Sequence, residues 1–399
     1  MKNFICIIFC LFETINYCAC EKCCNNDFNF NKIQNNKVIQ EYRSKHDRGG
    51  DSLELLGKGA NGAIYKINDQ YCLKVIKCKK YIEEQNRIKQ QIKKINDDTK
   101  VSENVQDIPI SDVHQKGDKN DEELDILEFT NEISISVYLK KIFNKIDKKK
   151  DVVKNIYKIH EVFNDEDNYY IISDLLEGDT LKKKINSNGY ILDNKLNKNL
   201  VLNDFKIICQ AVQFLHDNFI AHMDLKSDNI MFKTKDNKIP YIIDLGTAMM
   251  FQNKNKIDKN KYDYKIKDIK GSKRNYSYNI SKAINKNLEY DPKQYDVWCL
   301  GLILYNIVFR KELFSQFGFS NIINALFSFN KKKLYIKNVL KDRENFDIKK
   351  DPNVSHLAEL DSNCIFYDLL TRILTKKDED RILLQDIIKL IEEYQKKLI

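Results

Sequence analysis

The fold is decided by two short segments, Ala-His-Met-Asp-Leu-Lys-Ser-Asp-Asn at residues 221–229 and Asp-Leu-Gly at residues 244–246. The first segment contains a carboxylate, Asp224, that can orient a hydroxyl group and accept its proton. The amide of Asn229 and a second carboxylate, Asp244, are oxygen ligands that suit Mg²⁺ on a nucleotide. Phosphoryl transfer requires this combination of groups, and the sequence therefore predicts that chemistry.

A glycine-rich segment upstream, Gly-Lys-Gly-Ala-Asn-Gly-Ala-Ile at residues 57–64, fits the same chemistry. Glycine allows the backbone to come close to phosphate groups and to point its N–H groups at them. Lys74 lies on the next expected strand, where a lysine would contact the phosphates. Because a strand and not a helix follows the glycines, a dinucleotide-binding fold is disfavoured. Taken alone, the segment also fits an ordinary glycine hairpin, and Lys74 also fits an exposed strand lysine.

The pattern of apolar residues changes along the chain from strands to helices. Short runs of β-forming residues predict strands at 53–56, 63–67, 71–76, 156–163, 169–176 and 230–232. Apolar residues at helical spacing predict helices at 124–142, 202–216, 298–309, 369–374 and 382–398. The run 298–309 is too short to span a membrane and predicts a buried central helix. A strand-rich front half and a helical back half predict a two-lobed α+β protein.

Together these features resemble the eukaryotic protein kinase family, of the serine/threonine type, across roughly residues 53–397. The resemblance implies a kinase domain at 51–397, with a small strand-rich N-lobe at 51–176 and a helical C-lobe at 177–397. It also implies ATP bound in the cleft between the lobes. The polar insertion at about 79–122 is far longer than the family norm and is read as low-complexity padding or as an arm for a partner.

The resemblance implies a nucleotide site built largely in the N-lobe. Its residues by position are Gly57, Gly59, Gly62, Ile64, Cys72, Lys74, Ser173, Asp174 and Leu176. The glycines would cover the phosphates, and backbone groups of Asp174 and Leu176 would bind the adenine base. Ser173 takes the position before the hinge, where a small side chain leaves a deep pocket behind adenine.

The resemblance also assigns catalytic roles. Lys74 would pair with a glutamate of the following helix, which we assign to Glu132, with Glu128 one turn earlier as the alternative. Asp224 would act as the base, and Lys226 would neutralise the transferred phosphoryl group. The Mg²⁺ ligands would be Asn229 and Asp244.

Later landmarks fit the same family. Gly271-Ser272 takes the position where a hydroxyl would reach the base, and Asp-Val-Trp-Cys-Leu-Gly at 296–301 matches the motif that anchors the catalytic loop. Arg381 takes the position of the family's arginine near the end of the domain.

Two departures from the family pattern carry consequences. Met223 replaces the arginine that usually neutralises a phosphorylated activation loop, so we expect activity that needs no phosphate within residues 247–276. Asn279 takes the place of an acidic residue and cannot form the charged pair with Arg381. We therefore expect the segment around residues 277–279, where the family docks its substrates, to be less firmly held.

Composition and charge exclude several classes of protein. The net charge of +9 is modest for 399 residues, and the basic runs are scattered, so no nucleic-acid partner is expected. Five cysteines stand singly in apolar stretches, as buried free thiols would, at positions 72, 78, 209, 299 and 364. The cysteine spacing fits no zinc site. The family resemblance implies protein substrates. No transmembrane segment is expected, and a monomer is taken as the default state.

The amino terminus predicts secretion. Lys2, the apolar run 4–12 and Cys18-Ala19-Cys20 resemble a signal peptide at residues 1–20, with an uncleaved cytosolic extension as the alternative. Residues 21–50 are rich in Asn and Lys and predict a flexible lead-in. The Asn and Lys bias after a signal-like leader resembles the secreted kinases of apicomplexan parasites, such as the rhoptry kinases.

Two other functions stay open at this point. A pseudokinase that acts as a scaffold or regulator is favoured by the altered residues 277–279 and the long insertion. A kinase of small metabolites would use a related loop but usually lacks the lysine at the position of Lys226.

Overall fold

A computed structural model describes most of the chain outside its amino terminus and four longer gaps. The described residues are 33, 36–44, 53–59, 62–77, 121–145, 155–165, 168–236, 238–251, 271–286, 288, 290–314, 331–361 and 363–397. The predicted signal peptide at 1–20 and nearly all of the insertion at about 79–122 lie outside them. The chain divides into two units, Met1–Lys140 with Lys158–Leu175 and Lys141–Tyr157 with Leu176–Ile399.

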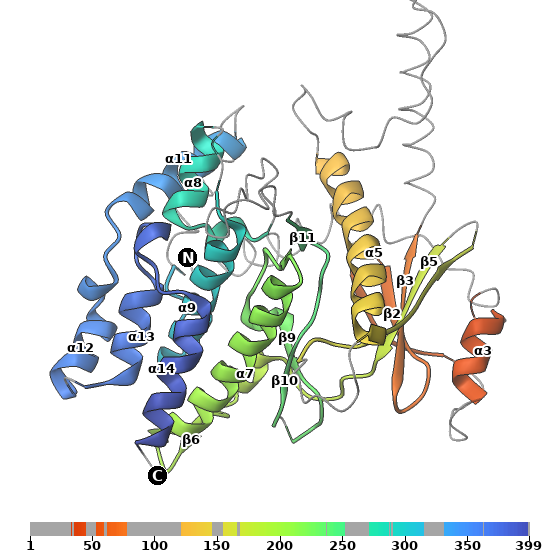
Figure 1. Cartoon of the computed structure of the whole chain (residues 1–399), viewed down its shortest axis with the longest axis horizontal. Coiled ribbons are helices and arrows are strands. Elements are labelled where there is room, and N and C mark those ends of the chain that lie inside the picture. The colour runs from red at the N-terminus through yellow and green to blue at the C-terminus, as the bar shows by residue number, and fades with distance from the viewer. Residues whose placement is uncertain are drawn as a thin grey trace, which may run out of the picture. The chain divides into compact units, whose positions relative to one another are not determined.

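The first unit contains a five-stranded antiparallel sheet in the order β1-β2-β3-β5-β4 (Figure 1). The strands are β1 (Glu54–Gly59), β2 (Gly62–Lys66), β3 (Tyr71–Lys77), β4 (Ile159–Asn164) and β5 (Asn168–Asp174). The strands predicted from the sequence in this part of the chain are present, with ends shifted by at most three residues.

The register of the strands assigns side chains to the two faces of this sheet. Lys74 of β3 pairs with Ile64 of β2 and with Ile171 of β5, and Cys72 pairs with Ser173. Directly paired residues point to the same face, and residues two apart on one strand do so too. Lys74 therefore shares its face with the side chains that the resemblance assigned to nucleotide binding.

The opposite face of the sheet forms an apolar core with the amino-terminal segment. The core cluster contains Ile33, Ile39, Leu53, Ala63, Tyr65, Ile67, Leu73, Val75, Tyr170 and Ile172. Ile39 comes from helix α3 (Lys37–Ser44), and Figure 1 shows α3 and α5 (Asp121–Lys145) on opposite sides of the sheet.

Within the segment 21–50, which the sequence predicted as a flexible lead-in, the described residues 33 and 36–44 include a helix and buried apolar side chains. Ile33 and Ile39 are fully buried, and Val38 packs against the same cluster. The sequence did not indicate this, because only a few apolar residues stand in a polar, Asn-rich stretch. Their burial depends on a sheet that forms later in the chain.

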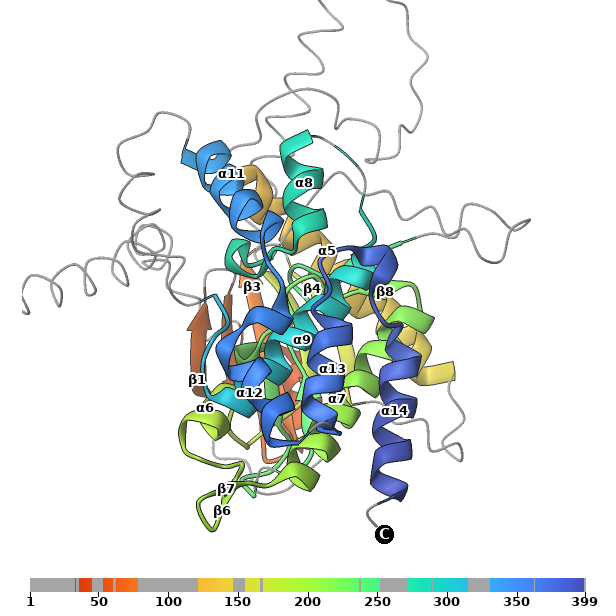
Figure 2. The same ribbon diagram turned by 90° about the vertical axis from the view of Figure 1, so that its left-hand side faces the viewer.

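The second unit is mainly helical (Figure 2). Its helices are α6 (Leu181–Asn186), α7 (Lys198–Asp217), α8 (Tyr278–Lys286), α9 (Pro292–Phe309), α11 (Lys331–Glu344), α12 (Pro352–Leu360), α13 (Ile365–Ile373) and α14 (Leu384–Lys396). Short strands pair as β6 (Ile191–Leu192) with β7 (Lys195–Leu196), β8 (Ile220–Ala221) with β11 (Met249–Met250), and β9 (Ile230–Phe232) with β10 (Pro240–Ile242). A strand-rich unit and a helical unit confirm the predicted α+β class.

Helix α9 is the buried central helix of this unit, as predicted, but it begins six residues before the predicted start at 298. Asp291 caps its amino terminus by accepting hydrogen bonds from the N–H groups of Lys293 and Gln294, and Pro292 occupies the first turn. A carboxylate cap followed by proline is a strong helix start. Across the described residues, none of the helices combines the length and the apolar character needed to cross a membrane.

A buried ion pair stabilises the packing of α6 on α7. The Lys184 ammonium lies 2.8 Å from Asp204 Oδ2, and the Tyr190 hydroxyl donates to the same oxygen over 2.7 Å. The ammonium also lies 4.2 Å from the centre of the Phe232 ring. Burial raises the pKa of the Asp204 carboxyl, and the adjacent Lys184 opposes that rise. Because these groups are enclosed by the fold, their role is structural.

The cysteines in the described part of the chain are free thiols. Cys209, Cys299 and Cys364 are buried, and Cys72 is partly buried. The prediction of unpaired thiols is confirmed for these four residues, whereas Cys78 lies outside the described residues.

Candidate active site

The glycine hairpin of the first unit joins β1 to β2. Gly59 pairs with Gly62, and the tip residues 60–61 lie outside the described residues. A Cβ atom added at Gly62 would lie 2.2 Å from the Val75 carbonyl oxygen, whereas one added at Gly57 would meet nothing within 4 Å. Gly62 is therefore required by close packing on β3, while Gly57 leaves open space beside the backbone.

Lys74 forms an ion pair with Glu132 of α5. The Glu132 side chain is 1% exposed and the Lys74 side chain is 24% exposed. This is the pairing assigned from the sequence; the side chain of the alternative, Glu128, lies outside the described part of α5. The buried carboxylate fixes an ammonium group that is still open to a ligand, and a fixed, partly exposed lysine is suited to bind phosphate.

Cys72, Ser173 and Asp174 lie together at the end of the paired strands β3 and β5. The Cys72 Sγ atom lies 3.3 Å from Ser173 Oγ and 3.4 Å from the Asp174 carbonyl oxygen. Burial raises the pKa of the Cys72 thiol, which keeps it protonated and able to donate. The Asp174 carboxylate lies 2.6 Å from His160 Nε2, a contact that the sequence did not indicate. Leu176 is largely buried and belongs to the second unit.

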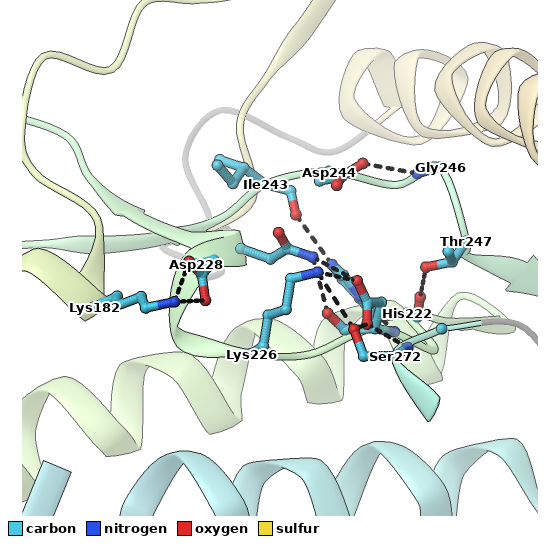
Figure 3. A network of polar contacts seen from close by, with 12 residues as sticks. Lys182, His222, Lys226, Asp228, Ile243, Asp244, Gly246, Thr247 and Ser272 are labelled. Atoms are coloured by element: carbon cyan, nitrogen blue, oxygen red, sulfur yellow. Dashed lines mark hydrogen bonds and ion pairs between the residues drawn. The ribbon is translucent and has the colours of Figure 1, made fainter. Parts of the chain in front are cut away.

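The second unit holds Asp224 in a network of hydrogen bonds (Figure 3). Asp224 Oδ1 accepts from the Ser272 N–H over 2.8 Å and from the Ser272 hydroxyl over 2.6 Å. Asp224 Oδ2 accepts from Lys226 Nζ over 2.6 Å and from Asn229 Nδ2 over 3.2 Å. The structure thus brings together the predicted catalytic residues Asp224 and Lys226 and the predicted metal ligand Asn229. A carboxylate with these four donors is fixed in orientation before any substrate arrives.

Asn229 and Asp244 offer oxygen atoms to a cation. Asn229 Nδ2 also donates to the Asp224 carbonyl oxygen over 2.9 Å, so the amide nitrogen faces the loop and the amide oxygen is the atom suited to a metal. Asp244 is exposed, has a φ of 63°, and accepts weakly from the Gly246 N–H over 3.3 Å (Figure 3). Within the described ranges, there is no group of three or more His, Cys, Asp or Glu side chains that could hold a metal ion.

Asp296 anchors the loop that carries these residues, in agreement with its predicted role. The buried Asp296 carboxylate accepts from the N–H groups of His222 over 2.8 Å and of Met223 over 2.9 Å. His216 Nε2 lies 2.9 Å from the same carboxylate. The sequence analysis did not select His216, although its place at the end of the predicted helix 202–216 was a usable signal.

The segment that carries Ser272 comes very close to this loop. Gly271 has a φ of +91°, and a Cβ atom there would lie 2.1 Å from the Met223 carbonyl oxygen. A larger residue could not bring the Ser272 hydroxyl to Asp224 without moving the loop.

Asp228 belongs to the same loop but not to the network around Asp224. It is exposed and pairs with Lys182 of α6 over 3.0 Å, and Figure 3 shows this pair apart from Lys226 and Ser272. Its substitution therefore provides a control for changes within the network.

Comparisons with known proteins agree with this geometry. Residues 141–390 match the family described as protein kinase domain. This range includes Asp224, Lys226, Asn229 and Asp244 but begins after Lys74 and Glu132. For the first unit, the assignment therefore depends on the five-stranded sheet and the Lys74–Glu132 ion pair.

Curated relatives are protein kinases by name, and two of the following three are named serine/threonine kinases. The chain is 29% identical over 54% of its length to "Probable serine/threonine-protein kinase RTK1" of Saccharomyces cerevisiae, 32% of which is covered. It is 30% identical over 44% of its length to "Serine/threonine-protein kinase Nek1" of Mus musculus, 13% of which is covered. It is 26% identical over 71% of its length to "Calcium-dependent protein kinase 4" of Plasmodium falciparum, 42% of which is covered.

The chain thus spans less than half the length of each of these three relatives. The family match covers more than half of the chain and contains the anchored Asp224 loop. The chain belongs to the protein kinase family.

Proposed function

We propose that the chain transfers the γ-phosphoryl group of ATP to serine and threonine hydroxyl groups of protein substrates, with Mg²⁺. The observation that carries the proposal is the Asp224 carboxylate, which is held by Ser272, Asn229 and Lys226. Serine/threonine kinases appear by name among the relatives, and Lys226 two residues after the base favours that type over tyrosine kinases.

Asp224 would orient the substrate hydroxyl and accept its proton. Its Oδ1 oxygen is engaged by Ser272, and its Oδ2 oxygen lies beside the Lys226 ammonium, 2.6 Å away. A positive charge at that point would offset the negative charge that develops on the transferred phosphoryl group. The arrangement provides a base and a neutralising cation on one short loop.

The phosphates of ATP would be held by Lys74, and Gly57 leaves space for their approach. Asn229 and Asp244 would hold Mg²⁺. The donor set fits this ion, because magnesium is usually held by one or two protein oxygens together with phosphate oxygens and water. When bound, Mg²⁺ offsets the charge of the phosphate oxygens.

The experiment that tests the proposal is transfer of labelled phosphate from ATP to a generic basic protein. We expect Asp244→Asn to lower the rate by at least about 10²-fold, because it removes a charged metal ligand. Asp228→Asn changes an exposed carboxylate of the neighbouring loop and should keep nearly the full rate.

Nucleotide binding without transfer by the wild-type chain would contradict the proposal and favour the pseudokinase. Transfer to a small alcohol but not to protein would favour the metabolite kinase instead. Equal rates for the wild type and Asp244→Asn would show that this carboxylate is not a metal ligand.

We further propose that activity needs no phosphate on residues 247–276. Met223 is fully buried, and its N–H is bonded to Asp296, so the loop is anchored without an arginine at this position. Phosphatase treatment, checked by mass spectrometry of that segment, should leave the rate unchanged. A rate that falls as phosphate leaves the segment would contradict this.

The location of the protein stays a prediction. The signal-like residues 1–20 lie outside the described residues, and secretion and the likeness to secreted apicomplexan kinases depend on them. Mass spectrometry of the native amino terminus would show whether the leader is removed.

A further inference from the structure

Arg381 is a buried arginine between α13 and α14. Its side chain is fully buried and donates to three backbone carbonyl oxygens, those of Ile373 (3.0 Å), Gln294 (2.8 Å) and Thr375 (2.9 Å). Carbonyl oxygens satisfy N–H groups but do not balance a full positive charge. A guanidinium in the interior needs an anion in contact with it, because an uncompensated buried charge is strongly destabilising.

Asp378 provides that anion. Its Oδ1 oxygen lies 2.6 Å from Arg381 Nη1, and its side chain is 12% exposed. Burial raises the pKa of the Asp378 carboxyl, while Arg381 and a hydrogen bond from Asn279 oppose that rise and the nearby Asp291 adds to it. Arg381 and Asn279 therefore favour the charged form of Asp378, and Asp378 in turn holds both of these side chains.

The link from Asp378 reaches α8, the helix that follows the Ser272 segment. The side chain of Asn279, the second residue of α8, lowers the pKa of the Asp378 carboxyl through hydrogen bonding, which places its amide beside that carboxylate. One residue earlier, the ring of Tyr278 lies 4.7 Å from Lys376 Nζ. The loop before Arg381 thus contacts the first turn of α8 at two consecutive residues.

Two further side chains hold the backbone between Ser272 and α8. Trp298 Nε1 donates to the Asn275 carbonyl oxygen over 2.9 Å. The buried Arg343 donates to the carbonyl oxygens of Arg274 over 3.0 Å and Tyr276 over 3.1 Å. The chain from Ser272 to α8 is therefore fixed at successive carbonyl groups, and its far end is fixed by Asp378.

We propose that Asp378 is a positioning residue: it balances the charge of Arg381 and, through the Asn279 amide, fixes the start of α8 and thereby the segment that brings Ser272 to Asp224. The expectation that Asn279 leaves this segment weakly held is replaced by this arrangement. The negative charge lies three residues before Arg381 instead of at position 279. The consequence for catalysis rests on the proposed kinase activity, whereas the anchoring of α8 does not.

The test compares Asp378→Asn with the double variant Asp378→Asn, Asn279→Asp in the full chain. The double variant moves the charge onto α8, across the same hydrogen bond. The first readout is hydrogen exchange at the backbone amides of residues 278–286, measured without nucleotide. This measurement does not require kinase activity. We expect about tenfold faster exchange in Asp378→Asn, and recovery of most of the protection in the double variant.

The second readout is the KM for a protein substrate. A shifted docking segment should raise KM about tenfold in Asp378→Asn, with ATP affinity unchanged and KM restored in the double variant. Asp380→Asn is the matched control, because Asp380 is an exposed acid on the same turn. It should change neither readout.

Three outcomes would overturn the proposal. The first is unchanged exchange of α8 in Asp378→Asn, and the second is faster exchange that the double variant does not reverse. The third applies if Asp378→Asn gives no folded protein: a double variant that also fails to fold contradicts the charge role. A wild-type chain without phosphate transfer would refute the proposed function alone, because the exchange result would still report on the anchor.

Discussion

The strand-rich unit and the helical unit each contain a buried acid paired with a lysine, and the two pairs differ in the exposure of the lysine. Lys184 is 7% exposed and is enclosed with Asp204, Tyr190 and Phe232. Lys74 is 24% exposed, although its partner Glu132 is buried as deeply as Asp204.

The difference distinguishes an ion pair that is enclosed by the fold from one whose lysine can still bind a ligand. The charge of Lys184 is balanced by Asp204 inside the fold, and little of the lysine side chain meets solvent. The ammonium of Lys74 is fixed by its partner but still meets solvent, on the sheet face that carries Ile64 and Cys72. An ion pair alone therefore does not indicate function; a fixed cation that stays accessible does.

The largest effect should come from the enclosed pair. Lys184→Met leaves Asp204 buried without its cation, and we expect the free energy of unfolding to fall by about 4 kcal/mol. The matched change Lys182→Met removes an exposed lysine of the same helix that is paired with Asp228, and should cost within about 1 kcal/mol. Urea denaturation of both variants measures the difference.

The loss in Lys184→Met should also depend on pH. Burial already raises the pKa of Asp204 in the folded chain, and removal of Lys184 raises it further. The folded state then binds more protons than the unfolded state above the carboxyl's ordinary pKa of 3.8, so stability falls as pH rises through that window. Denaturation at pH 5 and pH 8 should show the greater loss at pH 8, and a loss independent of pH would contradict this assignment.

A smaller effect of a different kind should come from the accessible pair. Glu132→Gln removes the negative charge beside Lys74, whose side chain is 24% exposed and in contact with water, so we expect stability to change by about 1 kcal/mol or less. Phosphate transfer should fall about 10²-fold, because the ammonium is no longer fixed. Glu161→Gln is the control, since Glu161 pairs with Lys140 in the same unit. If Glu132→Gln cost stability and left transfer intact, the distinction between the two pairs would fail.

The smallest of the main effects should come from the amino-terminal helix, when the 10²-fold loss of transfer is counted as about 2.7 kcal/mol. Ile39→Ala removes a fully buried side chain between α3 and the sheet, and should lower stability by about 2 kcal/mol. Hydrogen exchange should become faster in β3 and stay unchanged in α14. Gln40→Ala, an exposed neighbour on α3, should change neither. Unchanged exchange in β3 would show that α3 does not support the sheet.

The sequence predicted the Asp224 loop well because the contacts there are local. Asn229 lies five positions from Asp224, and Lys226 lies two positions from it, so residues that the family resemblance assigned to one loop also lie close together in space. Lys74 and Glu132 are 58 positions apart, which is why Glu128 stayed open as an alternative. The strands were found because each is a short run of β-forming residues with turn signals at its ends.

The contacts that the sequence did not indicate are those that join distant elements. Ile33 and Ile39 stand in a polar stretch with few other apolar residues, and the cluster that buries them is made mostly of strand residues from later in the chain. Asp378 is one of several acids in a charged stretch, and its importance appears only when Arg381 and Asn279 are seen beside it. The family pattern indicated that position 279 lacks the usual acidic residue. It could not indicate that Asp378 provides the negative charge beside Arg381 instead.

The glycine hairpin has a practical consequence for anyone who reads variant data on this protein. A side chain at position 62 would collide with the Val75 carbonyl oxygen, so inactive variants there would report a damaged sheet and carry no information about ATP. Position 57 has room for a methyl group. Loss of activity in a well-folded Gly57→Ala chain would be the cleaner sign that phosphates approach the hairpin backbone.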